Sequence, residues 1–200
     1  MQHKYTFYEL NLMTVIVSFA GFVFENCWLA LTCGYMDNRC MNLPFILGYG
    51  LAVAGFYVVI GTPNNLRFSS KLHHHLNKAE SYLLYFLIAM VAISVGEIVL
   101  GTVVERKFGF EYWNYSNMPL HITKFTSIPT SIGLALIVTL FMGFCYEPLM
   151  KCIHNMPQRA VKVIGIILMI MLVTDFLYCF RSMYINQEIH IWWTKTFKTL

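Results

Sequence analysis

Three carboxylates lie inside long apolar stretches of this 200-residue sequence: Glu25, Glu97 and Asp175. A charged side chain at the centre of a bilayer costs at least ~2.5–3.5 kcal/mol on insertion scales, so each of these acids requires a reason. Glu97, Gly101 and Glu105 follow one another at a spacing of four residues, which places two acids on one helix face with a small residue between them. Asp175 lies nearer the end of its stretch, where Arg181 or the membrane interface can satisfy it. The pattern predicts a polar cavity that opens to one side, and the alternative is that each acid is protonated or hydrogen-bonded and serves only helix packing.

A polar connection from Asp37 to Pro44 carries a cation that can reach such an acid. It contains Asn38 and Arg39, and a guanidinium can pair bidentately with a buried carboxylate or with an anionic ligand. A direct pair with Glu25 or Glu97 requires the connection to dip into the membrane, whereas Glu105 is within easier reach. We predict that Arg39 lies within salt-bridge distance of one of these three acids, and the alternative is an ordinary interfacial arginine.

A second polar connection, from Glu105 to Lys124, contains an aromatic run that includes Trp113, Asn114 and Tyr115. Aromatic side chains gather at membrane interfaces, so the run is an interfacial belt or a lid over the cavity. The candidate cavity residues are therefore Glu25, Asn38, Arg39, Glu97, Glu105, Trp113, Asn114 and Tyr115.

The elements that must position these residues follow from composition. Apolar residues make up 58% of the chain and charged residues only 12%, about half the share of a soluble domain, which excludes a soluble globular domain and a disordered chain. The apolar residues form five blocks, each near the ~20 residues that cross a bilayer: about 10–33, 45–61, 82–104, 128–146 and 161–180. We predict an all-α membrane protein, a polytopic helical bundle of about five transmembrane helices that forms a single transmembrane domain over residues 1–200.

Two local features refine this expectation. Pro148 is expected to end the fourth segment. The tail from Met183 to Leu200 mixes Ile, Trp and Phe with His and Lys, which is typical of a helix that lies in the membrane interface.

The orientation is nearly undecided by charge, because the 14 Lys and Arg residues divide evenly between the two sides of a five-span topology. The first connection has Arg39 as its one basic residue, which favours a cytoplasmic N-terminus in the plasma membrane. The two polar connections then share the opposite face, since an even number of crossings separates them.

Familiar catalytic and cofactor motifs are absent from the sequence. It has no phosphate-binding G-x-x-x-x-G-K-[ST] loop, no H-E-x-x-H, no nucleophile elbow and no C-x-x-C, so we predict no catalytic residue, no cofactor and no bound metal. The tract His73–His75 is read as a solvated loop. A basic face for nucleic acid is also missing.

A set of short motifs resembles a known family. It consists of Glu25 with Trp28, Asn38-Arg39, Pro44 to Tyr49-Gly50, Glu97 with Glu105, and Trp113-Asn114-Tyr115-Ser116, in order over roughly residues 15 to 150. The combination resembles the bacterial family of putative ABC-transporter type IV permeases. Cys40 stands where that family often has Gly, and Asn114 replaces its usual Asp, which removes a negative charge there.

The resemblance implies a transport component that works with a separate ATPase subunit in the lipid bilayer. Two other classes remain: a membrane-embedded enzyme acting on a lipid-like substrate with Glu97 or Glu105 as acid or base, and an accessory or sensor protein whose polar core fixes packing. The sequence leaves open the substrate, the direction of transport, the energy source and assembly into a homo-oligomer.

Overall fold

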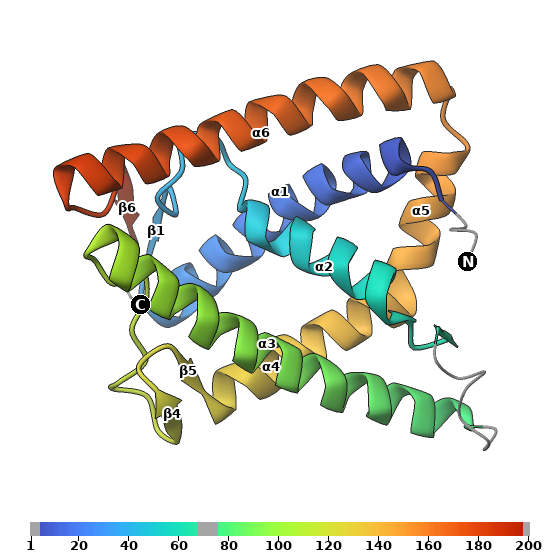
Figure 1. Cartoon of the computed structure of the whole chain (residues 1–200), viewed down its shortest axis with the longest axis horizontal. Helices are drawn as coiled ribbons and strands as arrows, with labels where there is room; N and C mark the ends of the chain where they lie inside the picture. Colours follow the sequence, from blue (N-terminus) through green and yellow to red (C-terminus); the bar gives the residue numbers. More distant parts are fainter. Residues whose placement is uncertain (1–4, 68–75, 198–200) are drawn as a thin grey trace. The chain divides into compact units, whose positions relative to one another are not determined.

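The computed structural model describes residues 5–67 and 76–197, drawn in Figure 1. Long helices dominate and the strands are short two-stranded pieces, which confirms the all-α prediction. Within these ranges, four helices are long and apolar enough to cross a membrane: Phe7–Thr32, Lys78–Phe108, Ile128–His154 and Gln158–Asn186. The His73–His75 tract lies outside the described residues.

The described residues form two compact units. The first contains residues 5–54 and 149–197, and the second contains 55–67 and 76–148. The single transmembrane domain stays a prediction.

In the first unit, α1 (Phe7–Thr32) and α6 (Gln158–Asn186) pack side by side, as Figure 1 shows. A capping box starts α1, because the Thr6 hydroxyl accepts the Glu9 N–H and the Glu9 carboxylate accepts the Thr6 N–H. At Gly165, α6 lies against α1, where a Cβ would be in ordinary van der Waals contact with Tyr8 O at 3.4 Å. Small residues drive such close helix contacts in lipid, where apolar burial gives no net gain.

The helix α2 (Leu47–Val59) begins beside the middle of α1. The Ile46 N–H donates to Ser18 O at 3.0 Å, and Ser18 lies about 17 Å from one end of α1 and about 21 Å from the other. Leu47 packs in one cluster with Val15 and with Leu172, which is the midpoint of α6. The first residues of α2 are therefore level with the centres of both long helices.

This position changes the second predicted span. With 13 residues, α2 extends only about 20 Å, less than the ~30 Å of a hydrocarbon core. The irregular residues 38–46 lead from the end of β1 to the start of α2. The second segment is thus a half-length helix preceded by irregular chain, unlike the full helix that the apolar block over 45–61 predicted.

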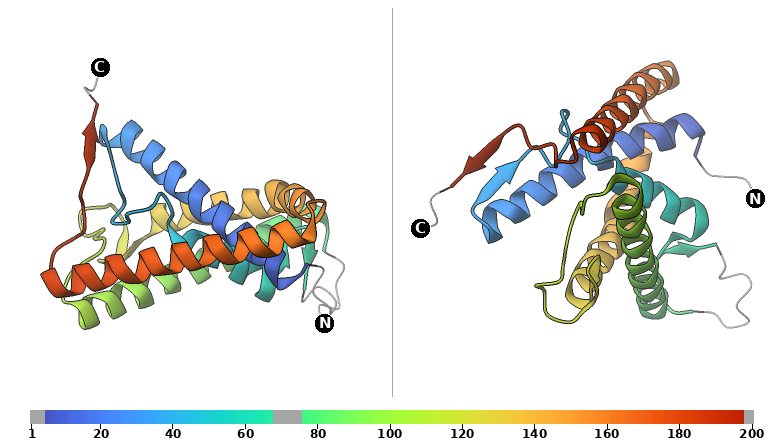
Figure 2. Two further views of the ribbon diagram at one scale, coloured as in Figure 1. Left: turned by 90° about the horizontal axis from the view of Figure 1, so that it is seen from above. Right: turned by 60° about the vertical axis from the view of Figure 1, so that its left-hand side comes forward.

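The C-terminal tail differs from the prediction as well. Gln187, with φ 54°, ends α6, and β6 (Thr194–Thr196) then pairs antiparallel with β1 (Tyr35–Asp37), side by side in Figure 2. The predicted interfacial helix over Met183–Leu200 is therefore wrong. The tail's polar and apolar pattern suits an interface, but its backbone finds hydrogen-bond partners in a strand far away in the sequence, which local periodicity does not reveal.

The second unit contains α3 (Lys78–Phe108) packed against α4 (Ile128–Leu140). Gly109 ends α3 in the left-handed conformation at φ 76°, where a residue without a Cβ is least strained. Two short hairpins complete the unit: β2 (Gly61–Thr62) with β3 (Asn65–Leu66), and β4 (His121–Thr123) with β5 (Thr126–Ser127).

Pro148 does not end the fourth segment. A π-helical turn over Phe141–Cys145 joins α4 to α5 (Tyr146–His154), and the Tyr146 N–H donates to Phe141 O, five residues back. The Gly143 carbonyl in this turn accepts hydrogen bonds from Asn64 Nδ2 at 2.9 Å and from the Tyr82 hydroxyl at 3.3 Å. The wider turn and its outside partners let the helix continue through a proline that lacks the N–H of a regular turn.

Candidate functional site

Arg39 forms the ion pair that the sequence predicts. Its Nη2 lies 2.8 Å from Glu25 Oε1, and its Nη1 lies 3.4 Å from Asp37 Oδ1. Glu25 lies about 10 Å from the C-terminal end of α1, so the connection dips beside the helix to deliver the guanidinium. The Arg39 and Glu25 side chains are only 25% and 27% exposed, which makes this a partly desolvated pair.

The backbone of this connection is unusual at the same point. Arg39 and Cys40 have φ values of 47° and 64°, two consecutive left-handed residues that are not glycine. Each costs roughly 1–2 kcal/mol in this conformation. The Asp37 carboxylate steadies the turn by accepting the Arg39 N–H at 2.8 Å.

Asn38 is buried, with 1% of its surface exposed, and its amide is fully engaged. Its Nδ2 donates to Met41 O at 2.9 Å and to His190 O at 2.8 Å, and its Oδ1 accepts the Trp192 N–H at 3.3 Å. Asn38 therefore ties the connection to the C-terminal tail.

Asp175 is bound by the same connection. Its Oδ1 accepts Asn42 Nδ2 and its Oδ2 accepts the Leu43 N–H, both at 3.0 Å, about 17 Å from the C-terminal end of α6. Asn42 Oδ1 also lies 3.0 Å from His190 Nε2. Asp175 thus binds Asn42 and Leu43 instead of Arg181 or the membrane interface, the partners expected from the sequence. Neither Asn42 nor His190 was predicted from the sequence as a site residue. The available signal was the position of Asn42, two residues before Pro44 in a predicted polar connection.

In the second unit, Glu97 belongs to a short chain of hydroxyl groups. The Thr126 hydroxyl donates to Glu97 Oε2 at 2.6 Å and lies 3.0 Å from Ser131 Oγ, which in turn accepts the Ser94 hydroxyl at 2.8 Å. Thr126 and Ser131 are buried. The chain links α3 to α4 through β5 and gives Glu97 a donor.

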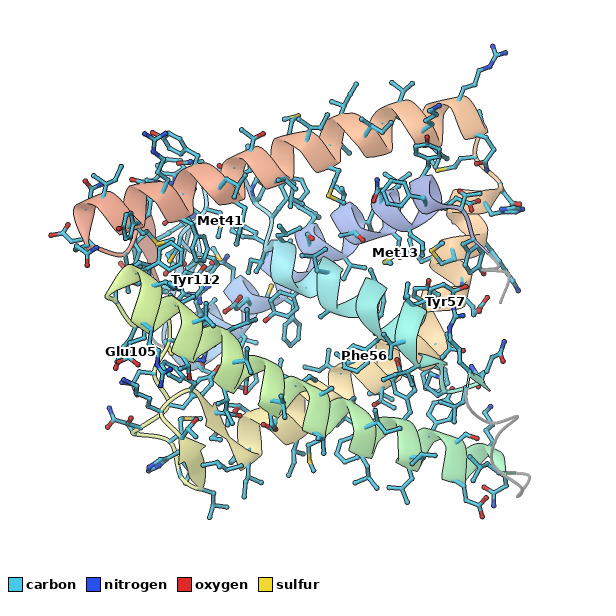
Figure 3. The ribbon with its side chains drawn as sticks, viewed as in Figure 1. Met13, Met41, Phe56, Tyr57, Glu105 and Tyr112 are labelled. Atoms are coloured by element: carbon cyan, nitrogen blue, oxygen red, sulfur yellow. The ribbon has the colours of Figure 1, made fainter. Side chains whose placement is uncertain are left out.

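Glu105 is held by a lysine in the following connection. Lys124 Nζ binds Glu105 and also Glu111, the latter at 2.8 Å, and Figure 3 labels Glu105 near the end of α3. The hydrogen bonds that Lys124 donates to Glu105 and Glu111 raise the pKa of Lys124, and the bond that Glu111 accepts from Lys124 lowers the pKa of Glu111. Asn114 Nδ2 donates to Glu111 Oε2 at 2.6 Å, so the amide at position 114 takes part in this cluster without a charge.

The aromatic run packs on the same connection. Trp113 Nε1 donates to Phe125 O at 2.8 Å, and the two rings meet edge to face at 6.1 Å. The Phe125 ring occupies the space beside Gly101, and the Tyr115 N–H donates to Lys124 O at 2.7 Å.

The predicted residues thus divide between the units. Glu25, Asn38 and Arg39 form one cluster in the first unit, and Glu97, Glu105, Trp113, Asn114 and Tyr115 lie in the second. Among residues 5–67 and 76–197, no group of three or more His, Cys, Asp or Glu side chains is arranged to hold a metal ion.

Long apolar helices with partnered intramembrane acids define a polytopic helical membrane protein. The family described as putative ABC-transporter type IV matches residues 12–180, so the chain belongs to that family. No curated protein and no solved structure matches the chain.

Proposed function

We propose that this protein is the membrane-embedded permease component of a transporter driven by a separate ATPase subunit. The observation that carries the proposal is the half-length helix α2, whose start is level with the centres of α1 and α6. Irregular backbone is tolerated at membrane depth only where protein or water surrounds it, and interrupted spans of this kind are typical of substrate sites in transporters.

The polar groups around the irregular residues 38–46 support the same proposal. Glu25, Arg39 and Asp175 come from α1, the connection and α6, and all three contact or belong to the segment that precedes α2. A segment bound to two long helices can transmit a change in one to the other. We propose that a substrate cavity lies along this segment, and that Glu97 and Glu105 are the candidate polar groups of the second unit.

We also propose that the protein lies in the plasma membrane with its N-terminus in the cytoplasm. If the irregular residues 38–46 together with α2 make the second of five crossings, both polar connections lie on the outer face. Single-cysteine labelling in a variant without native cysteines tests this, and label reaching 37–44 and 106–124 from opposite sides would contradict it.

A second candidate is an accessory protein whose polar groups only fix packing. It is favoured by the fact that Glu25, Glu97 and Asp175 each have a hydrogen-bond donor. Buried polar groups that are satisfied can specify one arrangement of helices without binding a ligand.

One experiment separates the two candidates. The tagged full-length protein is purified from the membranes of its own host, its companions are identified by mass spectrometry, and ATP hydrolysis by the complex is measured in nanodiscs. We expect an ATPase subunit in stoichiometric amount, and we expect Glu97→Gln to lower hydrolysis about tenfold or more. Glu188→Gln, at an exposed position, is the matched control.

Copurification without an ATPase contradicts the transport proposal. An ATPase complex with unchanged hydrolysis in Glu97→Gln would instead assign Glu97 to packing.

A further inference from the structure

The end of the described chain lies along the Arg39 connection. We define residues 189–197 as the strap. Its hydrogen bonds to the connection are Asn38 Nδ2 to His190 O at 2.8 Å, Trp192 N to Asn38 Oδ1 at 3.3 Å, Trp192 Nε1 to Met41 O at 3.3 Å, and His190 Nε2 with Asn42 Oδ1 at 3.0 Å. Pairing of β6 with β1 and a 2.7 Å bond from Phe197 N to Gly34 O extend the contact beyond the connection.

Hydrogen bonds hold the strap in place, and most of its large apolar side chains are exposed. Four of its five large apolar side chains are 40–58% exposed, Ile189, Ile191, Trp192 and Phe197, and Trp193 is half-buried. Segments with few buried apolar contacts and many accessible backbone bonds are the first to open in a folded protein. The strap is therefore built to detach more easily than α1 or α6.

Three residues of the Arg39 connection are, in contrast to the strap, well buried. Asn38, Cys40 and Met41 are between 1% and 8% exposed, although they lie in irregular chain. Asn42 contacts His190 of the strap with one end of its amide and Asp175 of α6 with the other. Release of the strap would expose the connection and free one side of the amide that holds it to α6.

We propose that the strap is a gate over the Arg39 connection, which opens when β6 separates from β1. This inference rests on the proposed function, because a gate matters only where the connection lines a substrate path. The family match ends at residue 180, so the strap lies beyond the matched segment.

The native Cys40 reports opening directly. The other five cysteines are replaced by serine, and the full-length protein in nanodiscs is treated with a membrane-impermeant maleimide. Trypsin cleaves after Arg39, so mass spectrometry of the peptide that begins at Cys40 gives the labelling rate. No substrate or ATPase is needed for this measurement.

Two proline variants of β6 form a matched pair. The Phe197 N–H points to β1, and donors alternate along an antiparallel ladder, so the Lys195 N–H also points to β1 and the Thr196 N–H points away. We expect Lys195→Pro to raise the Cys40 labelling rate about tenfold, as loss of a ladder bond implies, and Thr196→Pro to leave it near that of the unmodified strap. Equal rates in the two variants would overturn the gate.

A disulfide tests whether the strap opens in the intact protein. Tyr35 and Thr196 are cross-strand partners, so Tyr35→Cys with Thr196→Cys can be joined by oxidation. We expect oxidation to lower Cys40 labelling at least about fivefold relative to the reduced form. An unchanged rate would mean that the strap stays bound in the intact protein, which would overturn the gate. Failure of the transport proposal would appear only in the ATPase experiment.

Discussion

In both units, a cation from the connection after a long helix binds a carboxylate on that helix: Arg39 binds Glu25 on α1, and Lys124 binds Glu105 on α3. The environments differ, because about a quarter of the Arg39 and Glu25 side chains is exposed against about a third of Lys124 and Glu105. Arg39 also stands on left-handed backbone in a connection tied to α1 and α6, whereas Lys124 clamps α3 to its own loop.

Two ion pairs of the same kind therefore differ in how much stability is lost when one partner is removed. Removing one partner of a desolvated pair leaves an uncompensated charge, while an exposed pair exchanges its partner for water at little cost. The first unit should therefore be sensitive to single substitutions, and the second should tolerate them.

The sharpest test of this difference is Arg39→Gln. We expect it to lower the free energy of unfolding by about 3 kcal/mol, because Glu25 and Asp37 lose their cation in a partly desolvated place. Denaturant unfolding in detergent micelles measures the change. Lys124→Gln is the matched substitution, and an equal loss in both variants would remove the distinction between the pairs.

The half-length helix α2 gives the next largest effect. A Cβ at Gly50 would collide with Thr14 O and Ser18 Oγ of α1, whereas a Cβ at Gly48 meets nothing within 4 Å. We expect Gly50→Ala to cost about 2 kcal/mol, as overpacking does, and Gly48→Ala to be neutral or slightly stabilising through helix propensity. The midpoint temperature of thermal unfolding compares the two, and a tolerated Gly50→Ala would contradict the close approach of α2 to the centre of α1.

In the second unit, the glycine at a close contact is Gly101, which faces a side chain instead of a backbone carbonyl. The three atoms nearest to a Cβ at Gly101 would all belong to the Phe125 side chain, while the space beside Gly96 is open. A ring can move where a backbone carbonyl cannot. We therefore expect Gly101→Ala to cost about 1 kcal/mol more than Gly96→Ala in the same assay. A cost as large as that of Gly50→Ala would show that the two units are equally rigid.

The smallest effect is a pH dependence of the Lys124 cluster. The lowered pKa of Glu111 gives a stabilising contribution that is present at neutral pH and is lost as pH falls through the folded-state pKa, below the usual range of a glutamate. The raised pKa of Lys124 gives a stabilising contribution that is lost as pH rises through the folded-state pKa, above the usual range of a lysine. The difference in melting temperature between wild type and Lys124→Met should be greatest between these limits. A difference independent of pH would assign it to lost packing.

The membrane class follows from composition and hydropathy, because only a long apolar helix satisfies its backbone inside lipid, and the approximate positions of four spans follow from the same requirement. The sequence also predicted that Arg39 lies within salt-bridge distance of one of three acids, with an ordinary interfacial arginine as the alternative, and the structure pairs it with Glu25. Charge and hydropathy are properties of each residue, and they can be read along the chain.

Tertiary structure alone decided which partner each group took. Arg39 binds Glu25 and not Glu97 or Glu105, the other two acids considered. Asp175 accepts hydrogen bonds from Asn42 and Leu43, and the tail forms a strand paired with β1 instead of an interfacial helix. The half-length α2 and the continuation of the helix through Pro148 likewise depend on carbonyls at Ser18 and Gly143 that meet donors distant in sequence. Hydrogen bonds between distant segments follow from where the backbone lies in space, and no local pattern of residues records that.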